Sequence, residues 1–232
     1  MKNLQEQNTQ VEQSVFTAQL QRRSFLQYAG AGAAGIALIA AGCKKRDRGI
    51  PEYEGVVLDF KDDFGVLNYA YALEQLEAAF YIQVASAPPS GFSAAEKAYF
   101  QDIQFHEIAH REYLKKALGA AAIGSLEVNF SSINFTDRTS VLATAKAFED
   151  LGVAAYNGAG VRLTTDAYLV AAGKIVSVEA RHAAYIRDLI SNGSFANAEV
   201  VDANGLDVAL TPDKVLPIAA NYVKTKINVI NL

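Results

Sequence analysis

The chain has 232 residues, of which 51% are hydrophobic, and this is enough for one ordinary domain with a sizeable buried core. Its net charge of −4, without a long basic run, excludes a nucleic-acid-binding protein, which would need clustered lysine and arginine. The single cysteine, Cys43, excludes an internal disulfide bond and any zinc site built on two or more thiolates. A metal site in this chain would therefore use Asp, Glu and the three histidines.

Residues 1–43 have the composition of an export signal. Paired Arg22 and Arg23 precede an apolar run of small residues that ends at Cys43. The segment resembles a twin-arginine signal, which carries folded proteins across the bacterial inner membrane. Its last residues, "AAGC", resemble a lipoprotein processing site at which the cysteine receives the lipid. We expect an exported lipoprotein anchored to a membrane of the periplasm or cell envelope. The alternative is an uncleaved membrane anchor over residues 24–42.

The next segment, residues 44–55, is charged and contains Gly and Pro, as a tether does. We expect a folded domain over residues 56–193. Its first helix begins at Asp62 and Asp63 and ends before Pro88 and Pro89, with apolar residues at helical spacing between them.

A second helix is predicted from residue 93 to residue 119. Ser93 and Glu96 have the spacing of a capping box at its start, and Gly119 follows two lysines at its end. A third helix is predicted to open at Thr136 and Asp137 and to run to residue 160. The fourth occupies residues 164–193.

The link over residues 120–135 is longer than a tight helix hairpin needs, and its sequence favours an extended chain. At about 3.3 Å per residue it can run the full length of a bundle. One long crossover between the second and third helices is the ferritin-like arrangement of four helices. We therefore predict an all-α, ferritin-like four-helix bundle. A C-terminal extension follows over residues 194–232, with a short helix that has Thr211 as its cap and Pro212 at its first position.

Two of the three histidines lie three residues after a glutamate. Glu107 and His110 belong to the second predicted helix, and Glu179 and His182 belong to the fourth. Residues three apart share a helix face, so each pair offers a carboxylate and an imidazole to one metal ion. Ferritin-like di-iron and di-manganese proteins combine two such pairs with one glutamate from each of the other two helices.

The third helix offers Glu149 as its glutamate, whereas the first helix offers Glu74 and Glu77. Tyr156 follows Glu149 by seven residues, and Tyr81 follows Glu74 by seven, which is two turns along the same face. This repeat favours Glu74 and divides the chain into two related helix hairpins. We expect Glu77 to be a surface or interface charge.

Three further side chains lie near the predicted ligands. His106, four residues before His110, is expected behind a ligand or at the surface. Tyr81 and Tyr156 either hydrogen-bond ligand carboxylates or pass electrons, or they pack in the core with satisfied hydroxyls. The sequence leaves both alternatives open.

The segments "LNYAYALEQLEAAFY", "HEIAHREYL", "FEDLGVAAYNGAG" and "AAGKIVSVEARHAAYIR" together resemble the ferritin-like superfamily of ferritins, bacterioferritins and rubrerythrins. They are more similar to its exported ferritin-like domain group, also called desiccation-related. The resemblance spans residues 56–192. It implies a pair of Fe or Mn ions bridged by Glu107 and Glu179. His110 and His182 would be terminal ligands, and Glu74 and Glu149 would add one carboxylate to each ion.

The chain lacks two features found in some of these proteins. It has no Cys-x-x-Cys, which excludes a rubredoxin-like electron-transfer domain, and Met1 is its only methionine, which excludes a methionine-held haem. The favoured function is an oxidoreductase whose two ions give two electrons to O2 or peroxide. The alternative is a non-catalytic metal-binding or stress-protective envelope protein. A membrane tether disfavours a closed storage cage, but a smaller homo-oligomer is possible.

Overall fold

A computed structural model describes residues 53–232. The predicted export signal, including Cys43, and most of the predicted tether lie outside the described residues. Among the helices of residues 53–232, none is both long enough and apolar enough to cross a membrane.

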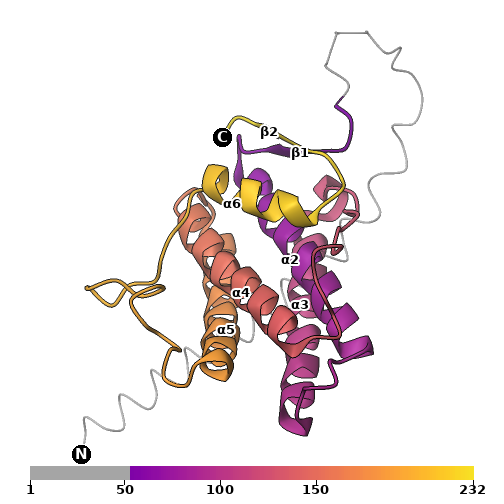
Figure 1. Ribbon diagram of the computed structural model, residues 1–232. Coiled ribbons are helices and arrows are strands. Elements are labelled where there is room, and N and C mark those ends of the chain that lie inside the picture. Colours follow the sequence, from indigo (N-terminus) through magenta and orange to yellow (C-terminus); the bar gives the residue numbers. More distant parts are fainter. Residues whose placement is uncertain (1–52) are drawn as a thin grey trace, which may run out of the picture. The chain divides into compact units, whose positions relative to one another are not determined.

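Four long helices form two hairpins (Figure 1). They are α2 (Asp63–Ser86), α3 (Ala94–Leu118), α4 (Arg138–Gly160) and α5 (Asp166–Ile190). Helix α2 packs along α3 and α4 packs along α5, while the two hairpins meet chiefly through α2 and α4. A long crossover joins α3 to α4. The predicted ferritin-like four-helix bundle is therefore confirmed.

Side chains cap three of these helices at the starts that the sequence predicted. The Asp62 carboxylate accepts a hydrogen bond from the backbone N–H of Phe64 at 3.0 Å. Ser93 and Glu96 form the reciprocal capping box. The Asp137 carboxylate accepts bonds from two backbone N–H groups in the first turn of α4. These bonds satisfy N–H groups that have no partner within a helix, so they fix where each helix begins.

The crossover begins with the short helix η2 (Gly119–Ala121) and then lies along α2. Two amide side chains of α2, two turns apart, form hydrogen bonds with the backbone of the crossover. Asn68 donates to the carbonyl of Ala121 at 2.9 Å and accepts from the N–H of Ile123 at 2.8 Å. Gln75 accepts from the N–H of Leu126 at 2.9 Å. Because half-buried backbone groups need partners, these amides replace the neighbouring strand that an extended segment would otherwise require.

The C-terminal segment returns to the start of the domain. It contains α6 (Pro212–Ala219), η3 (Ala220–Tyr222) and β2 (Ile227–Ile230), and β2 pairs in parallel with β1 (Val56–Asp59). Figure 1 shows α6 and the two strands at the same end of the bundle. The short helix begins at the predicted Pro212. The two four-residue strands were not predicted, because their pairing joins opposite ends of the domain.

A buried arginine fixes the chain that follows α5. The Arg187 side chain is 2% exposed. Its guanidinium donates to Asp150 of α4 at 2.6 Å, to Asn197 at 2.7 Å and to Glu199 at 2.5 Å. The last two residues belong to the C-terminal extension, so one charged group joins both helices of the second hairpin to this segment.

Helix α2 is the centre of the bundle, since it is buried over almost its whole length. One apolar cluster surrounds Phe80, whose ring contacts Phe130, Phe135 and Phe148. A second cluster includes Leu114 and parts of all four helices. Buried carboxylates within such a core lose their hydration, so they need cations or protons.

Candidate metal centre

The bundle brings together the six side chains that the sequence selected as ligands. Each of the four long helices contributes one glutamate, and all four glutamates are 0% exposed. The two histidines come from α3 and α5 and are nearly buried. The six residues are Glu74, Glu107, His110, Glu149, Glu179 and His182.

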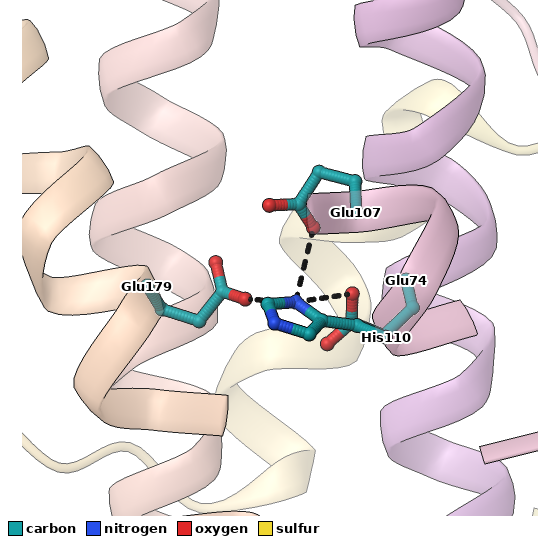
Figure 2. A group of neighbouring side chains, drawn as sticks. All are labelled: Glu74, Glu107, His110 and Glu179. Carbon is teal, nitrogen blue, oxygen red and sulfur yellow. Dashed lines mark ion pairs between the residues drawn. The ribbon is translucent and has the colours of Figure 1, made fainter. Parts of the chain in front are cut away.

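The first group surrounds His110. Its Nδ1 atom lies 2.7 Å from a Glu179 oxygen, 3.5 Å from a Glu74 oxygen and 3.8 Å from a Glu107 oxygen. Figure 2 shows these three carboxylates, from three helices, converging on the same ring nitrogen of His110. One atom of each residue lies within 4.8 Å of the others, which is a separation that a single ion can span.

The second group surrounds His182. Its Nδ1 atom lies 3.0 Å from Glu107, 3.3 Å from Glu149 and 3.6 Å from Glu179. The ligand atoms again lie within 4.8 Å of one another. Glu107 and Glu179 therefore belong to both groups. Each of them directs one oxygen toward His110 and the other oxygen toward His182.

The potential ligand atoms are left without hydrogen bonds. Within the described part of the chain, eight buried atoms of these six residues have no hydrogen-bond partner: both carboxylate oxygens of Glu107 and of Glu179, Oε2 of Glu74 and of Glu149, and Nδ1 of both histidines. Buried polar atoms almost always have partners, and these eight face chiefly one another, as carboxylate and imidazole groups that a cation could bind together. Each group offers three carboxylates and one imidazole, a donor set that suits Fe or Mn.

The remaining oxygens of two glutamates bind tyrosines across the bundle. Tyr81 of α2 donates to Glu149 Oε1 of α4 at 2.5 Å. Tyr156 of α4 donates to Glu74 Oε1 of α2 at 2.5 Å. Each tyrosine thus holds the glutamate of the opposite hairpin and turns its second oxygen toward a histidine. Of the two alternatives for these tyrosines, the hydrogen bond to a candidate ligand carboxylate is the one observed.

The carboxylates and histidines shift one another's pKa values strongly. Burial, aided by the charges of Glu179 and Glu107, raises the pKa of Glu74 well above its usual value. Burial also raises the pKa of Glu149, although His182 opposes the effect. In both His110 and His182 burial favours the neutral ring, but the surrounding carboxylates outweigh it and raise each pKa to about 12. Metal ions bind carboxylates and neutral imidazoles, so binding at this cluster would release protons.

Of the two alternatives expected for Glu77, a surface charge or an interface charge, the structure overturns the first. It is not a surface charge, since only 4% of it is exposed. Its carboxylate lies against Gly152 of α4, where an added Cβ would come within 3.0 Å of Oε1. Burial and four neighbouring carboxylates raise its pKa well above the usual value. Helical spacing placed Glu77 one turn from Glu74, but only the docking of α4 shows that this face is covered.

The third histidine contacts a candidate ligand. His106 Nδ1 lies 2.9 Å from His182 Nε2, and the two rings are within 6° of parallel. The sequence suggested a position behind a ligand or at the surface for His106, and the residue is exposed and also contacts a candidate ligand, which belongs to α5 and not to its own helix.

Residues 62–192 match the ferritin-like domain family. The chain belongs to this family. The match covers all four long helices of the bundle and both candidate ligand groups. A comparison with curated proteins gives no match. The ferritin-like bundle and its buried carboxylate and histidine cluster are thus established together, and they indicate a site able to hold metal.

Sequence reasoning identified all six converging side chains but missed two of their neighbours. The signal for Glu77 was present, because it follows Glu74 by three residues on the same face. The signal for Gly152 was also present, because it follows Glu149 by three residues and so occupies the related place in the second hairpin. Their contact required the two hairpins to be placed side by side.

Proposed function

We propose that this ferritin-like protein binds two Fe or Mn ions in a carboxylate-bridged pair. The observation that carries the proposal is that two four-residue ligand groups share Glu107 and Glu179. A carboxylate that directs one oxygen to each of two positions is suited to bridge two ions. His110 with Glu74 would complete one ion's ligands, and His182 with Glu149 those of the other.

The chain's own residues would keep these ligands oriented. Tyr81 and Tyr156 each occupy one oxygen of Glu149 and Glu74, which leaves a single oxygen of either carboxylate free for an ion. The apolar core excludes water from the fully buried glutamates, so their affinity for cations is not weakened by hydration. A pair of redox-active ions bound there would supply two electrons to O2 or peroxide.

A cleft between α3 and α5 supports a reaction with a small molecule. It measures about 380 Å³, and His106 and His182 line it together with Tyr99 and Tyr185. A candidate ligand thus contributes to a cavity wall. The activity that we propose is ferroxidase-like or peroxidase/catalase-like, with O2 or peroxide approaching His182 from this cleft.

Metal analysis followed by a turnover measurement tests this function. Purified protein incubated with Fe(II) or Mn(II) and freed of excess ion should contain close to two ions per chain. Repeated additions of peroxide or of Fe(II) with O2 should then be consumed catalytically. A protein that holds no metal after both incubations would contradict the proposal.

The second candidate is a non-catalytic function. The burial of four glutamates supports it, because bound ions would be needed there even if the protein catalysed no reaction. Two ions in this centre would offset the charge repulsion and stabilise the bundle by binding only its folded state. Such a metal-binding or stress-protective envelope protein would bind the same two ions but consume at most one stoichiometric portion of oxidant. The turnover measurement therefore distinguishes the two functions.

We also propose that the protein is exported and anchored in the cell envelope by a lipid on Cys43. The twin-arginine pattern and the "AAGC" sequence support this localisation. Cys43→Ser should move the protein from the membrane fraction to the soluble periplasmic or extracellular fraction. Continued retention of this variant in the membrane would favour an uncleaved anchor over residues 24–42.

A further inference from the structure

The contact between His106 and His182 joins α3 to α5 directly. His106 Nδ1 and His182 Nε2 are 2.9 Å apart, a hydrogen-bond distance, and the rings are nearly parallel. The opposite nitrogen of His182, Nδ1, faces Glu107, Glu149 and Glu179. His182 therefore stands between a set of candidate ligand carboxylates and a second imidazole.

The chemistry of the imidazole ring fixes the direction of this bond when an ion is bound. A neutral histidine that ligates through Nδ1 carries its proton on Nε2. In His182 this N–H points to His106 Nδ1, which must then be the acceptor. Partners of this kind orient a ligand imidazole and raise its basicity toward the metal.

His110, the other candidate ligand histidine, has no equivalent partner at the related position of the second hairpin. His106 precedes His110 by four residues, and the residue that precedes His182 by four is Val178. Val178 lines the same cleft as His106, but its side chain cannot accept a hydrogen bond. The two hairpins therefore repeat the ligands but not this supporting residue.

We propose that His106 is a positioning residue that makes the two metal positions unequal. By accepting the Nε2–H of His182, it makes the group of Glu107, Glu149, Glu179 and His182 the tighter of the two. The inference rests on the proposed function, since it requires two ions. It adds that they bind in sequence, with the His182 position filled first.

Calorimetric titration of the purified, metal-free full chain with Mn(II) tests the proposal. The unaltered protein should bind two ions in two resolved steps. His106→Val places in α3 the residue type found at the related position of α5. It should weaken the tighter step by about 10–100-fold, the usual cost of losing such a partner. The affinities of the two binding steps should then become more similar.

Two further variants separate positioning from general effects on the fold. His106→Gln keeps an acceptor oxygen, so it should recover part of the affinity lost in His106→Val. Tyr113→Ala removes an exposed aromatic side chain of the same helix, two turns from His106 and outside this cleft, and should leave both steps unchanged. The metal-free variants should have circular dichroism spectra like that of the unaltered protein.

The outcomes distinguish this inference from the proposed function. Two ions bound with unchanged affinities in His106→Val would overturn the role of His106 and leave the metal centre intact. A glutamine variant as weak as the valine variant would also overturn it, because the acceptor would then not matter. Failure of the unaltered protein to bind Mn(II) or Fe(II) would instead contradict the proposed function.

Discussion

The two helix hairpins, α2 with α3 and α4 with α5, carry the same four side chains at the same spacings within each helix. Glu74, Tyr81, Glu107 and His110 in the first correspond to Glu149, Tyr156, Glu179 and His182 in the second. The tyrosines even exchange partners, since each binds the glutamate of the opposite hairpin. The atoms that would hold the ions are therefore nearly symmetric.

The hairpins differ in the residues next to these candidate ligands. Where the first hairpin has Glu77, the second has Gly152, and the glutamate fills the space that the glycine leaves. Where the first has His106, the second has Val178. A pair of ions requires similar ligands on both sides, but it does not require similar surroundings. The departures from symmetry are thus the places where the two ions would acquire different properties.

Removing a shared carboxylate should break the symmetric centre completely. Glu107→Ala or Glu179→Ala should lose both ions, because the remaining ligands no longer offset the repulsion between two cations. Metal content after reconstitution with Fe(II) or Mn(II) measures this. Glu112→Ala, an exposed site on the same helix as Glu107, is the control and should retain both ions. A Glu107→Ala protein that still binds two ions would show that this carboxylate does not bridge.

Removing one terminal histidine should affect one half of the centre. His110→Ala should reduce the content to about one ion per chain, since His110 belongs to one ligand group only. His182→Ala should do the same for the other ion, and the ion it loses should be the more tightly held. Metal analysis across a series of Mn(II) concentrations compares the two variants. Equal affinities of the remaining ions would argue against unequal positions.

Removing one tyrosine hydroxyl tests the exchange of partners between the hairpins. Tyr81→Phe and Tyr156→Phe should each lower the free energy of unfolding of the metal-free protein by about 1–3 kcal/mol, because a buried carboxylate oxygen loses its donor. Denaturant titration measures the change. Tyr113→Phe, at an exposed tyrosine, should have little effect and provides the control. A large difference between the two variants would show that the hairpins contribute unequally.

Glu77→Gln should raise the free energy of unfolding of the metal-free protein by about 1 kcal/mol at neutral pH, because Glu77 is a buried carboxylate. The pKa of Glu77 is raised in the folded state, so its unfavourable contribution is absent below the unfolded pKa and grows as the pH rises above it. Glu77→Gln removes this dependence. Melting temperatures at several pH values should show a gain that disappears toward pH 4. A gain equal at all pH values would contradict the assignment to this ionisation.

Much of the fold and the six candidate ligands could be predicted because their signals lie within single helices. Asp62, Ser93 and Asp137 mark helix starts through bonds to the next few backbone N–H groups. The Glu-x-x-His pairs and the seven-residue Glu to Tyr spacing place side chains on one face for the same local reason. The length of the link over residues 120–135 then favours the ferritin-like crossover.

Only the tertiary structure decided which faces meet. A helix fixes the direction of a side chain relative to its own axis, whereas a contact between helices depends on how they dock. The sequence therefore placed Glu77 beside Glu74 but did not show that α4 covers it with Gly152. The bond between His106 and His182, the crossed tyrosines and the parallel pairing of β1 with β2 likewise join residues far apart in the chain. Docking of the four helices is likewise what brings the six candidate ligands together.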